Sequence, residues 1–325
     1  MTNRSDPFLK YEEIKKAAKI IKGGGLVSFP TETVYGLGAD ALNPMAVARI
    51  FEVKNRPYFD PIIIHVASPS SFEALTDNFN KIAQRLVKKF MPGPLTIVLP
   101  KSKIVPDIVT AGLPTVAIRI PSNRIALELI RESETLIAAP SANPFGYLSP
   151  TRVEHVKKHL GDQIDMILDG GECTVGIEST IIKIDESESL LLRFGGLPLE
   201  EIEKVVGKIR IPEMDKIIPE SPGLLPYHYS PKTPLKIIEN IDTIKPNGRR
   251  IGILAFKALQ NNLPNANIEV LSPNGDLREA TARLFPLLHR LDASGVDIIY
   301  AQSVPEVGLG RAIMDRLQRA SNSNF

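Results

Sequence analysis

Hydrophobic and polar residues alternate along residues 1–208 with two periods, one typical of helices and one typical of strands. Residues 11–25 predict an amphipathic helix, since Ile14, Ala17 and Ile21 fall on one side of it and lysines on the other. Short apolar runs then predict strands, with further helical segments between them. The expected strands are 26–30, 61–67, 95–100, 115–122, 136–143, 166–171, 179–185 and 190–196, and the further helices are 43–56, 68–78, 80–93, 151–164 and 197–207.

A proline-rich stretch over residues 209–234 interrupts this pattern and predicts an extended linker. It carries aromatic residues, including Tyr229, which an inert spacer rarely contains, so we expect it to dock on another part of the molecule. A simpler alternation follows over residues 235–325. Its expected strands are 235–240, 249–256, 267–272 and 296–302, and its expected helices are 276–295, interrupted at Pro286, and 308–321.

This pattern predicts two domains. Strands alternate with helices over residues 1–208, which favours an α/β or α+β fold. The segment over 235–325 predicts a small Rossmann-like α/β domain with a parallel sheet. The length of 325 residues agrees with two domains.

Composition narrows the function classes. The net charge is only +2, which argues against wrapping by nucleic acid while leaving room for a local basic pocket. The single cysteine, Cys173, cannot form an intramolecular disulfide, which fits a reducing compartment. The first residues lack the pattern of a signal peptide, and no apolar run approaches the ~20 residues that span a bilayer. We therefore expect a soluble cytoplasmic protein without a membrane partner.

Two sequence motifs suggest ligands but favour structural interpretations. The GLGADA stretch from Gly36 matches a dinucleotide fingerprint, yet Pro30 interrupts the preceding strand and the next helix begins only near Asn43, so we expect a glycine-rich turn. His155 and His159 have the spacing of paired metal ligands on a helix, but lysines lie between them. A solvated helix face is the better interpretation, and no metal ligands are predicted.

Polar residues gather at the ends of otherwise apolar strands. Any one of them has an ordinary structural explanation, but as a set they contain many bases and few acids. Buried bases need partners, so the pattern suggests an anionic ligand such as a triphosphate. The residues are Thr31, Glu32, Thr33, Lys54, Arg56, His65, Arg119, Ser141, Asn143, Ser179, Thr180 and Arg193.

Several of these segments together resemble a known family. SFPTETVYGLGADA, KNRPYFDPIIIHV, PGPLTIVLP, AIRIP, APSANPFGYLSPT, GIESTII and LLRFGGLP are similar, in this order, to the YrdC-type threonylcarbamoyl-AMP synthases. The K-x-R and S-x-N signature of that family matches Lys54, Arg56, Ser141 and Asn143. SPGLLPYHYSPKTPL, followed by a small α/β domain, is similar to the long two-domain form of the family.

The resemblance implies a YrdC-like twisted mixed sheet around a basic cleft in residues 1–208, a linker or lid over 209–234 and a C-terminal domain over 235–325. It implies a nucleotidyltransferase that converts L-threonine, bicarbonate and ATP into threonylcarbamoyl-AMP and pyrophosphate. Mg²⁺ would accompany ATP, without a metal bound by the protein itself. The product would serve a downstream tRNA threonylcarbamoyl transferase complex that forms N6-threonylcarbamoyladenosine, and a weak contact with tRNA is a further expected interaction.

The resemblance also implies roles for individual residues. Arg119 suits the carboxylate of threonine because its guanidinium forms two parallel hydrogen bonds. Signature residues with an expected catalytic role are Lys54, Arg56, Ser141 and Asn143. The expected L-threonine contacts are Thr31, His65, Arg119, Ala139 and Ser179, and the expected ATP contacts are Lys54, Arg56, Tyr58, Thr115, Ser141, Ser149, Arg193, Tyr229 and Ser230.

One alternative of another class stays open at this point. A non-catalytic RNA-binding module would also present a basic concave surface, although the small net charge weighs against it. A relative that handles carbamoyl phosphate is disfavoured, since the zinc-finger segments of such proteins need CxxC pairs and the chain has one cysteine.

Overall fold

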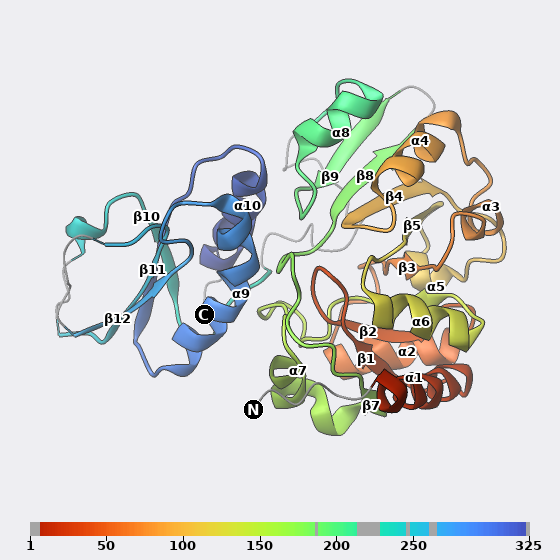
Figure 1. Ribbon diagram of the computed structural model, residues 1–325, viewed down its shortest axis with the longest axis horizontal. Helices are drawn as coiled ribbons and strands as arrows, with labels where there is room; N and C mark the ends of the chain where they lie inside the picture. The colour runs from red at the N-terminus through yellow and green to blue at the C-terminus, as the bar shows by residue number, and fades with distance from the viewer. Residues whose placement is uncertain (1–6, 186–187, 213–227, 245–247, 260–264, 323–325) are drawn as a thin grey trace.

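The computed structural model describes residues 7–185, 188–212, 228–244, 248–259 and 265–322. They form two units, each built on its own sheet (Figure 1). The helices are α1 (Pro7–Lys22), α2 (Pro44–Lys54), α3 (Ser71–Leu75), α4 (Lys81–Phe90), α5 (Asp107–Thr110), α6 (Arg124–Ser133), α7 (Val153–Leu160), α8 (Leu199–Val206), α9 (Leu277–Ala293) and α10 (Leu309–Ser321). The strands are β1 (Val27–Phe29), β2 (Gly36–Asp40), β3 (Ile64–His65), β4 (Leu95–Pro100), β5 (Thr115–Arg119), β6 (Ile137–Ala138), β7 (Met166–Ile167), β8 (Thr180–Ile184), β9 (Ser189–Arg193), β10 (Leu235–Ile238), β11 (Ile251–Ala255), β12 (Ala266–Val270) and β13 (Ile298–Gln302).

The larger sheet is mixed, as the resemblance implies. Its strand order is β7-β1-β2-β6-β3-β5-β4-β8-β9, with antiparallel pairs such as β4 with β5 and parallel pairs such as β4 with β8. Every strand and helix expected before residue 208 has a counterpart. β3 and β6 are only two residues long, because Pro61 and Pro140, which cannot donate to a ladder, lie close to them.

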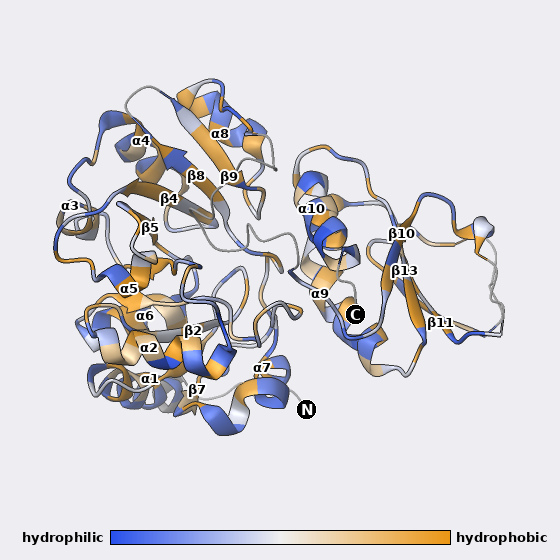
Figure 2. Cartoon of the chain, turned by 180° about the vertical axis from the view of Figure 1, so that it is seen from behind, coloured by the Kyte–Doolittle hydropathy of each residue, from blue (hydrophilic) through white to orange (hydrophobic). Residues whose placement is uncertain are grey.

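The two faces of this sheet have different surroundings because side chains alternate along a strand. In β4, Leu95, Ile97 and Leu99 are fully buried and pack in a core shared with α2, α4 and α8. Each such side chain contributes roughly 1.5–3 kcal/mol to folding. Thr96 lies between them on the opposite face, where the polar side chains of the neighbouring strands gather. The hydrophobic strands and the hydrophilic outer turns of α1 are visible in Figure 2.

Local signals fix the start of α2. The Asn43 side chain accepts hydrogen bonds from the backbone N–H groups of Met45 and Ala46, and Pro44 occupies the first helical turn, where its missing N–H costs nothing. The helix ends at Asn55, which has a left-handed conformation with φ of 50°. This cap fixes the start of the helix, which runs to Lys54 in its last turn.

Three elements of the first unit differ from expectation, one of them the short helix α5, for which no helix is predicted. The stretch from Gly36 is not a turn but strand β2, which pairs antiparallel with β1. Its glycines serve close packing: a Cβ on Gly38 would lie 2.7 Å from the ring of Phe29. Helix α6 was not anticipated, although Asn123 caps it in the same way as Asn43 caps α2.

The second unit has the predicted parallel sheet, in the order β10-β13-β11-β12. Helices α9 and α10 lie between this sheet and the first unit (Figure 1). The expected interruption of α9 at Pro286 is wrong, since the helix runs through it. Proline only removes the hydrogen bond to the Ala282 carbonyl. Gly176 of the first unit packs at that point, where an added Cβ would lie 2.6 Å from the Ala282 oxygen.

Candidate active site

One cavity gathers most of the polar side chains that the sequence singled out. Its empty volume is about 520 Å³, which includes space open to solvent. It lies where β1, β5 and β9 end and β8 begins, beside the residues that precede the second unit. The lining residues are Thr31, Thr33, Val34, Gly36, Arg56, Ile63, His65, Arg119, Ala139, Pro140, Ser141, Glu178, Ser179, Arg193, His228 and Tyr229.

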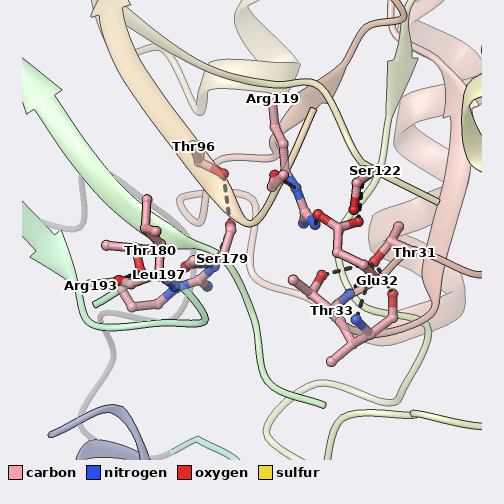
Figure 3. Close-up of polar contacts among 12 residues, drawn as sticks. Thr31, Glu32, Thr33, Thr96, Arg119, Ser122, Ser179, Thr180, Arg193 and Leu197 are labelled. Atoms are coloured by element: carbon pink, nitrogen blue, oxygen red, sulfur yellow. Dashed lines mark hydrogen bonds and ion pairs between the residues drawn. The ribbon is translucent and has the colours of Figure 1, made fainter. Parts of the chain in front are cut away.

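Arg119 projects from the end of β5 into this cavity and is held by Glu32 (Figure 3). Its Nη2 donates to Glu32 Oε1 at 2.7 Å, and the backbone N–H of Ser122 donates to the other carboxylate oxygen at 3.0 Å. Both side chains of this ion pair are at least nine-tenths buried. Among the described residues, none accepts a hydrogen bond from Nη1 of Arg119, so the guanidinium keeps donor capacity for an anion.

The turn after β1 is organised by Thr31. Its Oγ1 donates to the Val34 carbonyl at 2.6 Å and accepts from the N–H groups of Thr33 and Val34. A threonine hydroxyl stabilises such a turn by replacing a backbone partner. The result places Thr31, Glu32 and Thr33 at one wall of the cavity, as the sequence pattern suggests.

His65 lies beside Arg119, because β3 pairs with β5 in a register that opposes these two residues. Burial and, next, the Arg119 charge lower the pKa of His65 from 6.5 to about 3, so the ring is neutral at neutral pH. Its Nδ1 is buried and has no hydrogen-bond partner among the described side chains and backbone. A neutral imidazole with a free ring nitrogen can bind a hydroxyl group.

The K-x-R and S-x-N segments form one network. Lys54 Nζ donates to the Ser141 carbonyl at 2.6 Å and also to the Asn143 carbonyl. The Asn143 amide donates to the Tyr147 carbonyl at 2.8 Å, and the Lys54 carbonyl accepts from the N–H of Phe145. The spacing of the signature is therefore explained locally: the last turn of α2 holds the loop over 141–147.

Buried cations meet at this end of the cavity. Arg56 forms an ion pair with Asp60 at 2.9 Å and donates to the Pro61 carbonyl at 2.8 Å. Burial, reinforced by the neighbouring Arg56 charge, holds the pKa of Lys54 well below its usual 10.5. The expectation that few acids accompany these bases is wrong for Arg56, which pairs with Asp60, and for Arg119, which pairs with Glu32.

Arg193 reaches the cavity from the end of β9. Its Nε and Nη2 donate to the Ser179 carbonyl at 3.1 and 3.0 Å, and the Ser179 hydroxyl shares a 2.7 Å hydrogen bond with Thr96 (Figure 3). A register shift between β8 and β9 leaves Leu192 as an extra residue, and such bulges redirect the next side chain. Gly195 permits this approach, since a Cβ there would lie 2.3 Å from the Ser179 backbone.

Two residues that precede the second unit close the cavity. His228 is nine-tenths buried, and Tyr229 is buried with φ of 62°, a left-handed conformation that is strained for a tyrosine. Burial and the charges of Arg56 and Lys54 hold the pKa of His228 well below its usual value. The expected docking of the linker is thus seen at these positions, while residues 213–227, including Tyr227, lie outside the described part of the chain.

Several predicted residues do not line the cavity. Lys54, Asn143 and Ser149 are buried behind its wall, and Ser230 bonds through its backbone to the Gly146 carbonyl. Tyr58 is 59% exposed and stacks on Phe51 outside it. Thr115 begins β5 at the end opposite Arg119. Conversely, two polar residues that line the cavity, Glu178 and His228, have no predicted role, although each is adjacent in sequence to a residue that has one.

The paired histidines of α7 are not on a solvated face. The His155 ring stacks on His289 of α9, with ring centroids 3.8 Å apart, and His159 lies against Tyr147. Burial lowers the pKa of His155 to about 3. Over the described parts of the chain, no group of three or more His, Cys, Asp or Glu side chains is arranged to hold a metal ion. Within the same parts, no helix combines the length and apolar character needed to cross a membrane.

Comparison with known proteins places this geometry in a family. Residues 19–195 match the Sua5, YciO and YrdC family, whose description is "Telomere recombination". Residues 197–322 match the family described as "Threonylcarbamoyl-AMP synthase, C-terminal domain". The threonylcarbamoyl-AMP synthase of Pyrococcus abyssi is 45% identical over 95% of this chain and 94% of its own length. That of Bacillus subtilis is 41% identical over 95% and 93%.

Solved structures agree with the sequence comparison. The crystal structure of P. abyssi Sua5 complexed with L-threonine superposes with a TM-score of 0.89 at 44% identity, covering 96% of this chain and 94% of that one. The agreement spans both sheets. The chain therefore belongs to the two-domain Sua5-type threonylcarbamoyl-AMP synthase family.

Proposed function

We propose that this chain is an L-threonylcarbamoyladenylate synthase, which makes threonylcarbamoyl-AMP and pyrophosphate from L-threonine, bicarbonate and ATP. The observation that carries the proposal is one cavity with two kinds of cationic side chain. Arg119, fixed by Glu32, lies among small polar residues suited to an amino acid, while Arg56 and Arg193 serve a phosphate chain. The names of the relatives and the L-threonine bound to P. abyssi Sua5 support the same reaction.

At the amino-acid end, Arg119 binds the threonine carboxylate through its remaining donors, because the ion pair with Glu32 occupies one side of the guanidinium. Neutral His65 lines the same cavity and can accept a hydrogen bond from the substrate hydroxyl through a ring nitrogen. Thr31, Ala139 and Ser179 complete the threonine site. Desolvation in this cavity favours the neutral substrate amine, which takes up CO₂ derived from bicarbonate to form a carbamate.

At the nucleotide end, a carbamate oxygen attacks the α-phosphorus of ATP, and the bond from that phosphorus to the bridging oxygen breaks to release pyrophosphate. This is a nucleotidyl transfer, in which positioning and charge stabilisation are the main contributions of the protein. Arg56 and Arg193 stabilise the charge that develops. Lys54 positions the loop that carries Ser141 and Asn143.

Mg²⁺ would accompany ATP and supply positive charge that offsets the charge of the phosphates. We assign no protein ligand to it. The remaining ATP contacts in the proposal are Tyr58, Thr115, Ser149, Tyr229 and Ser230. Of these, only Tyr229 lines the cavity in this structure, so Tyr58, Thr115 and Ser230 require the bound nucleotide to extend beyond it. Ser149 is fully buried and would act through Glu178, whose carboxylate accepts a hydrogen bond from its hydroxyl.

We also propose the division into residues 1–208, 209–234 and 235–325. Helix α8 supports the first boundary, since Leu199 and Ile202 pack in the core of the larger sheet, although the C-terminal family match begins at residue 197. The product would pass to a downstream tRNA threonylcarbamoyl transferase complex in the cytoplasm.

The test is product formation. The protein is incubated with ATP, Mg²⁺, bicarbonate and labelled L-threonine, and the nucleotides are separated and identified by mass. We expect an adenylated threonylcarbamoyl product that disappears when bicarbonate is omitted. Salt-dependent tRNA binding without any ATP turnover would overturn the proposal in favour of a non-catalytic RNA-binding module.

A further inference from the structure

Three cavity-lining segments that are far apart in sequence converge on one arginine of the second unit. Arg316 lies on α10 and is only 1% exposed. Its Nε donates to Glu178 Oε2 at 2.9 Å, and its Nη1 donates to the Phe194 carbonyl at 2.8 Å. Its guanidinium carbon lies 4.8 Å from the centre of the Tyr229 ring. Arg316 therefore contacts the GIEST segment, the end of β9 and the residues that precede the second unit.

Each of these contacts leads to a proposed ATP contact. The second oxygen of Glu178 accepts a hydrogen bond from the Ser149 hydroxyl, and Phe194 directly follows Arg193. Tyr229 is itself a lining residue, and its strained left-handed backbone needs a surrounding that holds it in place. By contrast, Glu32, the ion-pair partner of the threonine-site arginine, comes from the turn after β1, and within the described part of the chain no hydrogen bond or ion pair joins it to α10.

The surroundings of Arg316 keep its guanidinium charged and held in place. Burial opposes its charge, but Tyr229, Glu178 and Asp315 outweigh this effect and raise its pKa. Arg316 and Arg193 likewise lower the pKa of Glu178 despite its burial. Asp315 bridges Arg316 to Arg319 of the same helix, so the guanidinium is held from both sides. In such a water-excluded site each member of the ion pair fixes the position of the other, because displacement of either one would leave a buried charge uncompensated.

We propose that Arg316 is a positioning residue through which the C-terminal domain sets the nucleotide half of the active site. It acts through Glu178, Phe194 and Tyr229. Of the threonine half, Ser179 directly follows Glu178, whereas Arg119, Glu32 and His65 form no hydrogen bond or ion pair with Arg316 among the described residues. This inference rests on the proposed function only for the names of the two substrates. The domain contact itself does not depend on Arg316, because Leu284, Phe285 and other apolar residues of α9 share a core with Val34 and Ile177.

The experiment compares Arg316→Met with Arg311→Met in the full chain. Arg311 is a matched control, since it lies on the same helix and pairs across the same interface with Glu200 at 3.1 Å. Its guanidinium lies 5.9 Å from the centre of the Phe194 ring, but among the described residues no hydrogen bond or ion pair joins it to Glu178 or Tyr229. The KM for ATP and the KM for L-threonine are measured separately from pyrophosphate release. We expect Arg316→Met to raise the KM for ATP about tenfold or more, because the variant loses a charge-assisted hydrogen bond. The KM for threonine should change less than about twofold.

Two further variants guard against a general loss of structure. Arg316→Lys keeps the charge but cannot form the same fork, so its KM for ATP should lie between wild type and Arg316→Met. In the Glu178→Gln background, the effect of Arg316→Met should shrink, because the two residues act together. Equal rises in both KM values, equal effects of Arg316→Met and Arg311→Met, or additive effects with Glu178→Gln would each overturn the inference.

Failure of the proposed function is distinguishable from failure of this inference. If the wild-type protein makes no threonylcarbamoyl-AMP, the reaction assignment fails. Calorimetric titration of the same variants with a non-hydrolysable ATP analogue and, separately, with L-threonine still decides the role of Arg316. Selective weakening of analogue binding supports it, and unchanged analogue binding contradicts it.

Discussion

Substitution of Arg119 separates the structural and substrate-binding roles of the buried ion pair with Glu32. Arg119→Gln removes the positive member and leaves the carboxylate of Glu32 in a site where both side chains are at least nine-tenths buried. Of the hydrogen bonds that its carboxylate accepts, Glu32 would retain the one from the Ser122 N–H at 3.0 Å. The double variant Arg119→Gln, Glu32→Gln replaces the ion pair with two amides of similar size.

The structure sets the expected magnitudes. Breaking a buried pair by removing one partner costs about 3–5 kcal/mol of unfolding free energy, because the remaining charge is uncompensated. The double variant should recover most of that loss, since two neutral amides can hydrogen-bond to each other and to Ser122. Neither variant retains the guanidinium, so each should lose the ~1.5–3 kcal/mol of a charge-assisted contact with the threonine carboxylate, a roughly 10- to 150-fold rise in Kd.

Two measurements test this separation. Urea unfolding gives the stability of wild type, single and double variants, and calorimetric titration with L-threonine gives the Kd of each folded protein. L-Threonine methyl ester, which lacks the carboxylate charge, serves as the ligand control and should bind wild type and double variant with similar affinity. A double variant that regains stability and also binds L-threonine as tightly as wild type would refute the assignment of Arg119 to the substrate carboxylate.

Three further predictions follow from burial, charge and close packing. Lys54→Met should remove a pH dependence of ATP binding. A bound triphosphate raises the depressed pKa of Lys54, so the wild-type protein takes up protons on binding and its affinity for ATP falls as the pH rises toward 10.5. Calorimetric titrations in buffers of different ionisation enthalpy measure this proton uptake. The pKa of His65 is lowered to about 3 in the folded protein, so protonation of this ring favours the unfolded state and stability is lost as the pH falls below 6.5. Urea unfolding should show a loss of about 2 kcal/mol in unfolding free energy between pH 8 and pH 5, and His65→Gln should lack it. Gly195→Ala should reduce pyrophosphate release at least about tenfold and destabilise by roughly 1–3 kcal/mol, because its Cβ would meet the Ser179 backbone, whereas Gly161→Ala, with only Lys157 nearby at 4.0 Å, should change neither measurement.

The acidic partners of the site bases change how the cavity discriminates ligands. Because Arg56 pairs with Asp60 and Arg119 pairs with Glu32, the cavity does not attract polyanions non-specifically. An anion must compete with or complement a fixed carboxylate, which favours ligands whose negative groups fit particular positions. This arrangement agrees with a small-molecule enzyme better than with a non-specific RNA-binding surface.

Local sequence signals were sufficient for most elements and for the identity of many site residues. The Asn43 cap, the amphipathic first helix and the alternation along β4 are short-range patterns, which the chain carries whatever its tertiary context. The strand at Gly36 and the unbroken helix at Pro286 escaped prediction because packing outweighed propensity there: Phe29 fills the space above Gly38, and Gly176 packs against the helix where proline frees a carbonyl.

The pairing of charges was decided only by the tertiary structure. Glu32 and Arg119 are 87 residues apart, and Glu178 and Arg316 are 138 apart, so no periodicity in the chain could relate them. The sequence indicated which side chains carry chemistry, since an arginine in an apolar strand is unusual on its own. Which carboxylate each one meets, and which of its donors remain for a substrate, depends on strand order, on register and on the docking of α10, because these bring together groups that the chain keeps far apart.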